Sequence, residues 1–253
     1  MEEIKILAIN TSPRKGRNTE QLAEAVLEGC RSLNAQKPAA DVTEIDGDGS
    51  AAGTNAGETE AGAIEAGKTG ELKIVTEMIR VGDAPADGFQ LCRGCWGCVK
   101  KGSCVLKDDF VTEIHEKIRR ADGVILASPV FFCDVSAQCK IIMDRSLGLI
   151  PLGAGKASAA AITCGSVGVN SALHTIQGFC SMQGFIDAGW VATYGKTDDK
   201  TRGKEVAYAL GRKLVRLAAM TKREMAQADA SGDTQLRRDL EHCNHFAYGT
   251  HTF

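Results

Sequence analysis

The sequence predicts an α/β fold in which a doubly wound parallel sheet of five strands is covered by helices on both faces. Short apolar runs of strand length alternate with longer segments whose apolar residues recur every three or four positions, as in such a sheet. The chain has 253 residues, of which 43% are hydrophobic and 25% are charged, which is typical of a globular protein. A wholly disordered or collagen-like chain is therefore excluded.

The predicted strands are five apolar runs, at 4–10, 72–81, 123–127, 158–163 and 190–194. A run at 42–45 resembles 75–78 and competes for the second strand, but we favour the longer run at 72–81. Five parallel strands joined by crossover helices are typical of a flavodoxin-like sheet. Ligands of such a sheet bind at the carboxyl ends of the strands, so we expect the site in the loops that follow them.

The segments between the strands have helical periodicity. Leu22, Val26 and Cys30, four residues apart, predict a helix over 18–33, with Asn18 as its N-cap and Gln21 reaching back as in a capping box. Further helices are expected at 110–118, 135–147, 171–184 and 206–217.

One segment is not expected to fold. Residues 35–71 hold nine Ala, seven Gly and eight acidic residues but no aromatic one, so they cannot bury enough apolar surface to offset the entropy of ordering. We predict a disordered acidic insertion there, inside a single domain over 1–230. That domain is also expected to contain a cysteine-rich loop at 85–107, and 231–253 are expected to form a polar tail.

Net charge and hydropathy argue against nucleic-acid-binding, membrane and secreted proteins. The formal net charge is −2, so no basic field favours nucleic acid or an anionic membrane as a partner. The start of the chain lacks the features of a signal peptide, and no apolar run approaches the roughly 18 residues of a spanning helix. We therefore expect a cytoplasmic protein. Its ten cysteines would stay reduced, so clustered ones favour metal or redox chemistry over disulfides.

A basic loop follows the first predicted strand and directly precedes a helix. Unpaired backbone N–H groups at a helix start, together with the helix dipole, favour an anion. The loop adds side-chain donors, which are Ser12, Arg14, Lys15, Arg17, Asn18 and Thr19. It lacks the glycine spacing of a Walker loop and of the Gly-x-Gly-x-x-Gly dinucleotide fingerprint. The sequence predicts a phosphate site here, with a basic surface turn as the alternative.

Four cysteines form the strongest chemical signal, Cys92, Cys95, Cys98 and Cys104, in the pattern C-x2-C-x2-C-x5-C. A [4Fe–4S] cluster needs four converging thiolates, and one short loop supplies them at little cost in loop closure. Bacterial ferredoxin runs have three residues before the last cysteine and a proline after it, whereas this chain has five residues and then a valine. A [4Fe–4S] cluster is the leading prediction, with zinc or no metal as alternatives.

Together these motifs resemble a known family. Ser-Pro-Arg-Lys-x-x-Asn-Thr at 12–19 looks like the FMN-phosphate loop of the NADPH-dependent FMN reductase superfamily. The cysteine loop followed by Lys-Asp-Asp-Phe at 107–110 looks like its iron–sulfur flavoprotein branch, and Ser-Pro-Val-Phe-Phe at 128–132 with Lys140-x3-Asp144-Arg145 resembles a third shared block. The resemblance implies a flavodoxin-like homodimer or homotetramer that binds FMN. In that branch the [4Fe–4S] cluster passes electrons to FMN.

Carried over residue by residue, the resemblance assigns the FMN phosphate to Ser12, Arg14, Asn18 and Thr19. It assigns the flavin ring to residues after the third and fourth strands, namely Pro129, Val130, Phe131, Phe132, Thr163, Cys164 and Gly165. Phe131 stands where the family often has tyrosine, and Cys133 and Asp134 replace small residues, so the polarity at the flavin edge is expected to differ.

Two other functions stay open. The first is a cluster-free reductase that oxidises NAD(P)H and reduces FMN or quinones, and the second is a zinc-stabilised interaction module on the same scaffold. The expected electron donor is NAD(P)H, as a possible substrate, or a ferredoxin-like carrier. The sequence identifies no acid or base, so the catalytic residues are unknown.

The other cysteines carry weaker signals. Cys30, Cys139 and Cys180 fall on helical patterns and are expected to be small buried hydrophobes. Cys133 and Cys164 fall in the predicted flavin loops, so a minor redox role is kept for them as a hypothesis.

Overall fold

The computed structural model describes residues 2–35, 72–85, 87–106, 109–198 and 202–241. Five strands form a parallel sheet in the order β2-β1-β3-β5-β6. They are β1 (Glu2–Asn10), β2 (Leu72–Arg80), β3 (Gly123–Phe131), β5 (Ala157–Cys164) and β6 (Ile186–Tyr194). A short strand, β4 (Asp134–Val135), pairs antiparallel with the end of β3. The order of the parallel strands is that of a flavodoxin-like sheet and confirms the predicted fold class.

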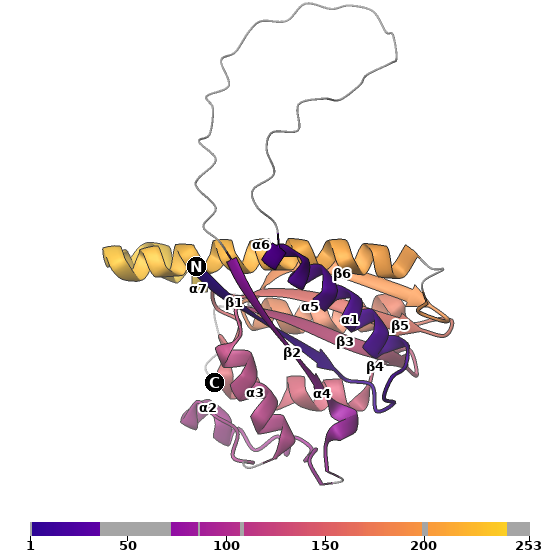
Figure 1. Cartoon of the computed structure of the whole chain (residues 1–253). Helices are drawn as coiled ribbons and strands as arrows, with labels where there is room; N and C mark the ends of the chain where they lie inside the picture. Colours follow the sequence, from indigo (N-terminus) through magenta and orange to yellow (C-terminus); the bar gives the residue numbers. More distant parts are fainter. Residues whose placement is uncertain (1, 36–71, 86, 107–108, 199–201, 242–253) are drawn as a thin grey trace, which may run out of the picture.

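Helices cover both faces of this sheet (Figure 1). They are α1 (Asn18–Arg31) and α6 (Arg202–Ser231) on one face, and α3 (Phe110–Arg120), α4 (Ala137–Asp144) and α5 (Val169–Met182) on the other. Shorter elements join them: η1 (Ser32–Ala35), η2 (Val81–Asp83), α2 (Gly97–Lys101), η3 (Leu147–Leu149) and α7 (Thr234–Glu241).

The side chains of β1 alternate between the two cores. Ile4, Ile6 and Ala8 belong to the core beneath α1 and α6, whereas Leu7 and Ile9 belong to the core beneath α3, α4 and α5. A central parallel strand is buried on both faces, and this explains why the strand is a continuous apolar run in the sequence.

Two glycines allow α1 and α6 to cross closely. A Cβ at Gly29 would lie 2.0 Å from the backbone oxygen of Tyr208, and a Cβ at Gly211 would lie 1.9 Å from that of Val26. A larger side chain at either position would push the helices apart. The crossing thus fixes α1 on the sheet, and with it the loop that precedes α1.

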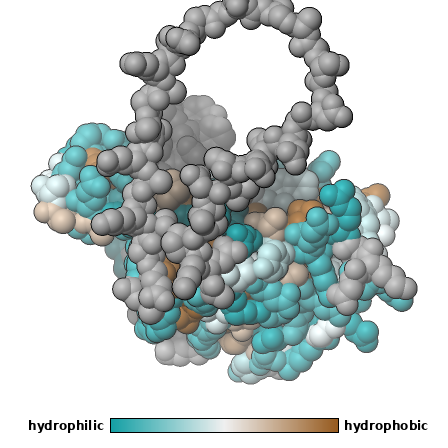
Figure 2. All heavy atoms as spheres, turned by 45° about the horizontal axis from the view of Figure 1, so that its top comes forward, coloured by the Kyte–Doolittle hydropathy of each residue, from teal (hydrophilic) through white to brown (hydrophobic). Residues whose placement is uncertain are grey.

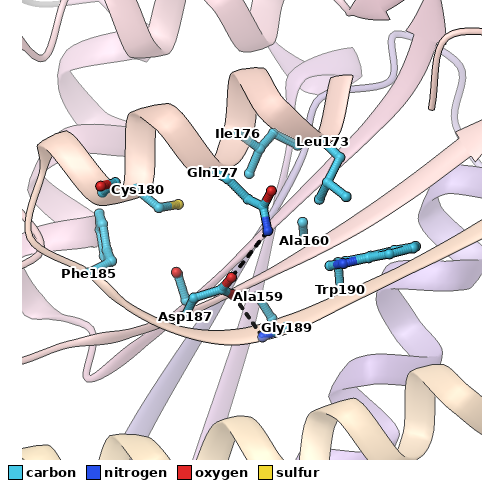
Figure 3. A pocket seen from close by; sticks show the side chains of 12 residues that line it. Ala159, Ala160, Leu173, Ile176, Gln177, Cys180, Phe185, Asp187, Gly189 and Trp190 are labelled. Atoms are coloured by element: carbon cyan, nitrogen blue, oxygen red, sulfur yellow. Dashed lines mark hydrogen bonds between the residues drawn. The ribbon is translucent and has the colours of Figure 1, made fainter. Parts of the chain in front are cut away.

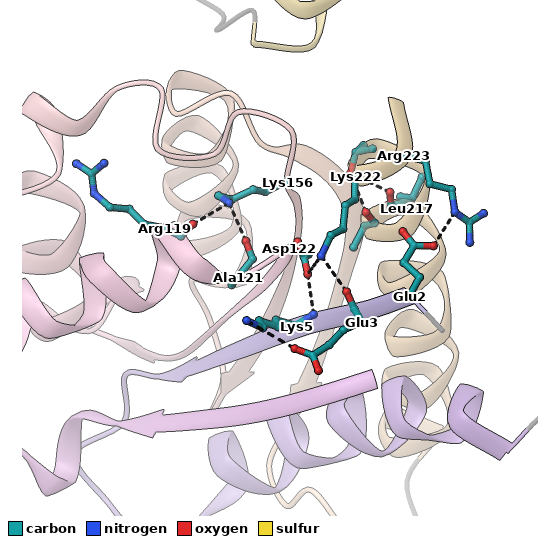
Figure 4. A network of polar contacts seen from close by, with 12 residues as sticks. Glu2, Glu3, Lys5, Arg119, Ala121, Asp122, Lys156, Leu217, Lys222 and Arg223 are labelled. Carbon is teal, nitrogen blue, oxygen red and sulfur yellow. Dashed lines mark hydrogen bonds and ion pairs between the residues drawn. The ribbon is translucent and has the colours of Figure 1, made fainter. Parts of the chain in front are cut away.

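A polar network ties α6 to the amino ends of the strands (Figure 4). Asp122 accepts hydrogen bonds from the backbone N–H of Lys5 at 2.8 Å and from Lys222 Nζ at 3.0 Å, and Lys222 also donates to the Glu3 carbonyl at 2.8 Å. Lys156 Nζ donates to two carbonyls at the C-terminus of α3, at 2.8 and 3.1 Å, and its burial lowers its pKa. The two bonds of Lys156 satisfy carbonyls that the end of α3 leaves without a helical partner.

The structure corrects the bounds of one predicted helix. The helix expected at 135–147 begins at Ala137 after its N-cap Ser136, because Asp134 and Val135 pair with β3 as β4. It ends at Asp144, and Leu147–Leu149 form the separate 3-10 turn η3. The tail expected from 231 holds the helix α7 in its described part. Most of the predicted insertion, including the competing run at 42–45, and residues 242–253 lie outside the described residues.

The surface visible in Figure 2 is largely hydrophilic, with scattered hydrophobic spots. Among the described residues, no helix is long and apolar enough to cross a membrane.

Candidate functional site

A cavity of about 690 Å³ opens at the carboxyl ends of β1, β3, β5 and β6. Most of the residues predicted for the cofactor line it: Ser12, Arg14, Arg17, Asn18, Thr19, Pro129, Val130, Thr163, Cys164 and Gly165. The loops after three different strands therefore converge, as the fold class predicts. The volume lies within the range of roughly 300–1,000 Å³ that is usual for small-molecule sites.

The basic loop places an anion site at the start of α1. Arg17 is the N-cap of this helix in an extended conformation, and its side chain makes no capping hydrogen bond within the described part of the chain. The first-turn N–H groups thus gain no acceptor from the cap. The Asn10 carboxamide oxygen accepts from Ser12 N at 3.1 Å, and Ser12 Oγ accepts from Arg14 N at 3.2 Å, so the loop is held in shape by its own side chains.

Asn18 and Thr19 join this loop to the other walls. Asn18 Nδ2 donates to the Gly195 carbonyl and Asn18 Oδ1 accepts from Thr197 N at 3.4 Å, while Thr19 Oγ lies 2.7 Å from Thr163 Oγ. The prediction of Asn18 as the N-cap is wrong, because its side chain is used across the cavity instead. Asn18 thus holds the loop after β6 against α1, and Thr19 holds the end of β5 against it.

The segment after β6 was missed by the sequence analysis. Gly195, Lys196, Thr197 and Asp198 line the cavity, as do Gly16 and Gln21 of the first loop. Their position directly after the last predicted strand was the available signal, because every strand of such a sheet ends at the same edge.

Three predicted cofactor residues lie elsewhere. Lys15 forms an exposed ion pair with Asp83. Phe131 is half-exposed and packs against Arg14, whose Cζ lies 5.9 Å from the ring centroid. Phe132 is fully exposed, because it turns the chain from β3 into β4 with a φ of +46°. Contact of Phe131 and Phe132 with a flavin stays a prediction.

Serine and threonine side chains fix the loop that leads from β3 into α4. Ser136 Oγ donates to the Thr11 carbonyl at 2.8 Å and accepts from Cys139 N at 3.3 Å as the N-cap of α4. Ser136 N in turn donates to Ser128 Oγ at 3.1 Å. The cavity wall made by the end of β3 is therefore bonded to the loop after β1.

The four predicted metal cysteines line a second, smaller hollow of about 130 Å³. Cys92 and Cys95 are exposed, whereas Cys98 and Cys104 are partly buried. Within the described ranges, no group of three or more Cys, His, Asp or Glu side chains is arranged to hold a metal ion. The structure thus brings the four thiols to one hollow without placing them in ligand geometry.

Arg145 lines the same hollow and is buried. Its Nη2 donates to the Leu106 carbonyl at 2.9 Å, and its guanidinium pairs with Asp109. Burial alone would raise the pKa of Asp109, but hydrogen bonds from Arg145 and Thr112 outweigh it and hold this pKa below its ordinary value. Arg145 Nε has no hydrogen-bond partner among the described residues. An arginine with an unpaired N–H that lines the same hollow as four cysteines suits an anionic four-thiolate centre, so the donor set fits a [4Fe–4S] cluster.

The cavity and the hollow lie at opposite ends of α4. Ser136 caps the start of this helix beside the cavity, and Arg145 follows its last residue beside the hollow. Eight helical residues rise about 12 Å along the axis.

The remaining cysteines separate into buried and loop positions. Cys30, Cys139 and Cys180 are buried, and burial raises the pKa of each thiol to about 12, which confirms their prediction as small core residues. Cys164 Sγ donates to the Val167 carbonyl at 2.9 Å, and Cys133 is exposed.

A further cavity of about 320 Å³ lies between α5, β5 and β6 (Figure 3). Apolar side chains including Leu173, Ile176 and Trp190 line it, and Asp187 accepts a hydrogen bond from Gly189 N at 2.7 Å within it. None of the residues predicted for the cofactor or the metal belongs to its described lining, and it shares no lining residue with the large cavity, so the two are separate.

The sequence matches the model of one protein family, NADPH-dependent FMN reductase, over residues 4–196. It is also similar to iron–sulfur flavoproteins of three archaea. The identities are 47% over 76 residues for Methanocaldococcus jannaschii, 30% over 157 residues for Archaeoglobus fulgidus and 30% over 144 residues for Methanosarcina thermophila. These matches cover 30%, 59% and 57% of this chain and 37%, 68% and 53% of the relatives. The chain thus spans less than two thirds of the first and third.

Solved structures share the fold. RosB with bound 8-demethyl-8-formylriboflavin-5'-phosphate aligns with a TM-score of 0.58 at 15% identity, over 97% of this chain and 90% of RosB. An oxidoreductase of Corynebacterium diphtheriae aligns with a TM-score of 0.53 at 15% identity, over 88% of this chain and all of that chain. At these identities the similarity shows the fold alone.

Proposed function

Because the chain belongs to the NADPH-dependent FMN reductase family, we propose that it is a flavin-dependent oxidoreductase in which electrons pass between a [4Fe–4S] cluster and FMN. The observation that carries the cluster is the convergence of Cys92, Cys95, Cys98 and Cys104 on one hollow beside an unpaired arginine N–H. The names of the similar archaeal proteins support the same assignment.

FMN would occupy the large cavity. The start of α1, with Arg14 and Arg17, supplies the charge and the backbone donors that a phosphate needs. Pro129 and Val130 at the end of β3 supply apolar surface for the ring, and Thr163 to Gly165 close the opposite wall. Lys196, which follows β6, adds a further cation to this cavity.

The cysteine loop would hold the cluster through its four thiolates. When bound, FMN accepts one or two electrons and so joins one-electron to two-electron chemistry. The protein's part is positioning: α4 spans the distance between the cavity and the hollow, capped by Ser136 at one end and followed by Arg145 at the other. Apolar neighbours of the cysteines, such as Leu106 and Leu147, line the hollow and would influence the potential of its occupant.

The donor in this proposal is NAD(P)H or a ferredoxin-like carrier, and the active form is a homodimer or homotetramer. A specific observation favours a second function, a cluster-free NAD(P)H-dependent reductase of FMN or quinones: the described cysteines do not stand in metal-holding geometry.

The absorption spectrum of anaerobically purified protein, with iron, sulfide, zinc and FMN measured on the same sample, tests the proposal. We expect a broad brown absorbance over flavin bands and about four irons per chain, as a four-iron cube requires. Flavin bands without iron, together with steady-state NAD(P)H oxidation, would replace it with the cluster-free reductase. Stoichiometric zinc in a colourless protein would overturn both.

A further inference from the structure

Arg145 lies where the cysteine loop closes. Its side chain is fully buried, with 0% exposure. Nη1 donates to the Gln90 carbonyl at 3.4 Å, two residues before Cys92, and Nη2 donates to the Leu106 carbonyl at 2.9 Å, two residues after Cys104. One guanidinium therefore bonds to both ends of the segment that carries the four cysteines.

The same guanidinium is anchored to the next helix. Asp109 pairs with Nη1 and accepts from Nη2 at 3.1 Å, and its Oδ1 also accepts from Thr112 N at 3.0 Å as the N-cap of α3. A buried arginine needs such a compensating carboxylate. The planar fork of arginine reaches two carbonyls and a carboxylate at once, which a lysine ammonium does not reproduce.

One donor of Arg145 is left over. Nε has no hydrogen-bond partner among the described residues, and Arg145 lines the hollow together with all four cysteines. Burial lowers the pKa of Arg145, but the hydrogen bonds and the charge of Asp109 help to outweigh it and raise this pKa above its ordinary value. Cys104 lines the same hollow as Arg145. A buried donor without a partner calls for an explanation, and an acceptor held by the cysteines supplies one.

We propose that Arg145 is the positioning residue of the cysteine site: its terminal nitrogens close the loop, and its Nε–H donates to a sulfur of the centre that the cysteines hold. The identity of that centre as an iron–sulfur cluster rests on the proposed function, but the closing of the loop does not. A positive charge and a hydrogen bond at the sulfurs favour the reduced state of a cluster.

The test compares full-length Arg145→Lys and Arg145→Gln with Arg119→Lys, a matched change at a solvent-exposed arginine of α3. FMN per chain, measured first, reports whether the far end of α4 is intact. We expect FMN to be unchanged, iron per chain to fall several-fold in both Arg145 variants, and Arg119→Lys to match wild type. In the cluster retained by Arg145→Gln, the ratio of reduced to oxidised form at a fixed potential should fall about tenfold, which corresponds to about 59 mV for one electron.

Trypsin reports the closing of the loop without any metal. Arg93, Lys100 and Lys101 are exposed cleavage sites inside it. In the metal-free full-length chain, Arg145→Lys should be cut at these sites about tenfold faster than Arg119→Lys, because local opening precedes cleavage and a lost bond of about 1.4 kcal/mol changes its population tenfold.

The outcomes separate the two proposals. If wild-type protein binds FMN but no iron, the proposed function fails, and Arg145 is then judged by trypsin and by the thiolate absorbance that Cd²⁺ alone induces in the full-length chain. Equal metal content, equal potential and equal cleavage in Arg145→Lys and Arg119→Lys would overturn the role of Arg145. Loss of FMN in both Arg145 variants would overturn it too, because it would show a general structural role.

Discussion

The large cavity and the cysteine hollow are held by the fold in different ways. The cavity is walled by the ends of strands whose interiors are buried, and hydrogen bonds such as that between Thr19 and Thr163 join its walls. The cysteine loop carries one five-residue helix, α2, whose residues are exposed or half-buried. Its backbone has positive φ at Gly94, Trp96 and Gly102, and this conformation is costly for tryptophan.

This difference indicates which site is formed in advance. Strand ends stay in place because the whole sheet must unfold to move them, whereas an exposed loop opens locally at small cost. We therefore expect the cavity to keep its shape without FMN, and the cysteine loop to depend on Arg145 and on its occupant.

The largest expected effect is at the cysteines. Cys98→Ala should abolish iron binding, because a four-thiolate set loses one ligand, while FMN stays bound at the strand ends. Iron, sulfide and FMN per chain on one sample provide the measurement. Cys133→Ala, at an exposed cysteine outside the loop, is the control and should keep its iron. Loss of FMN rather than iron in Cys98→Ala would contradict the separation of the two sites.

The next effect is at the phosphate loop. Arg14→Ala should weaken FMN binding about ten- to hundredfold, because a charge-assisted hydrogen bond contributes about 1.5–3 kcal/mol, and should leave iron unchanged. Lys15→Ala is the matched control, since Lys15 pairs with Asp83, and should change the affinity less than about threefold. Flavin fluorescence titration measures both. Equal losses in the two variants would show that general charge, not position, attracts the cofactor.

A third change tests how much the close crossing of α1 and α6 contributes to the stability of the fold. Gly211→Ala should lower the free energy of unfolding by about 1–3 kcal/mol, because the new Cβ meets the backbone of α1. Gly178→Ala in α5, where nothing lies within 4 Å of a Cβ, should be neutral or stabilise by up to about 1 kcal/mol. Urea unfolding measures both, and an unaltered Gly211→Ala would show that the helices separate freely.

The smallest expected effect is a pH dependence of the free energy of unfolding, caused by a histidine on the face of the sheet that α3, α4 and α5 cover. His115 on α3 is buried, and burial lowers its pKa below the ordinary 6.5, although its ring N–H donates to the Ile142 carbonyl at 2.8 Å. The unfolded chain then binds this proton more readily. The contribution of neutral His115 to the free energy of unfolding is fully present above pH 6.5. It is lost as the pH drops toward the folded-state pKa, by at most about 1.4 kcal/mol per pH unit.

Urea unfolding at several pH values between 5 and 7.5 checks this direction. His115→Gln should flatten the slope, whereas His174→Gln, at an exposed histidine of α5, should leave it as in wild type. Identical slopes for wild type and His115→Gln would contradict the assignment.

Most strands of the sheet, and the anion site of the large cavity, could be predicted from the local sequence pattern. The strands were identifiable because each is an apolar run, and the anion site because a basic loop joins a strand to a helix. The wall at Gly195 to Asp198 could have been predicted from its place after the last strand. The contact of Arg145 with the cysteine loop could not, because its partner Gln90 lies far away in the sequence. The exposure of Phe132 could not be predicted from local pattern either, because the reversal into β4 depends on pairing with β3.

The sequence by itself determined the order of strands and helices, the four closely spaced cysteines and the basic loop, because each depends on neighbours within a few residues. Only the tertiary structure decided which loops meet, that α1 and α6 touch at Gly29 and Gly211, and that one buried arginine closes the cysteine loop. These features depend on atoms that packing brings together across the chain, and local propensity carries no information about such pairs.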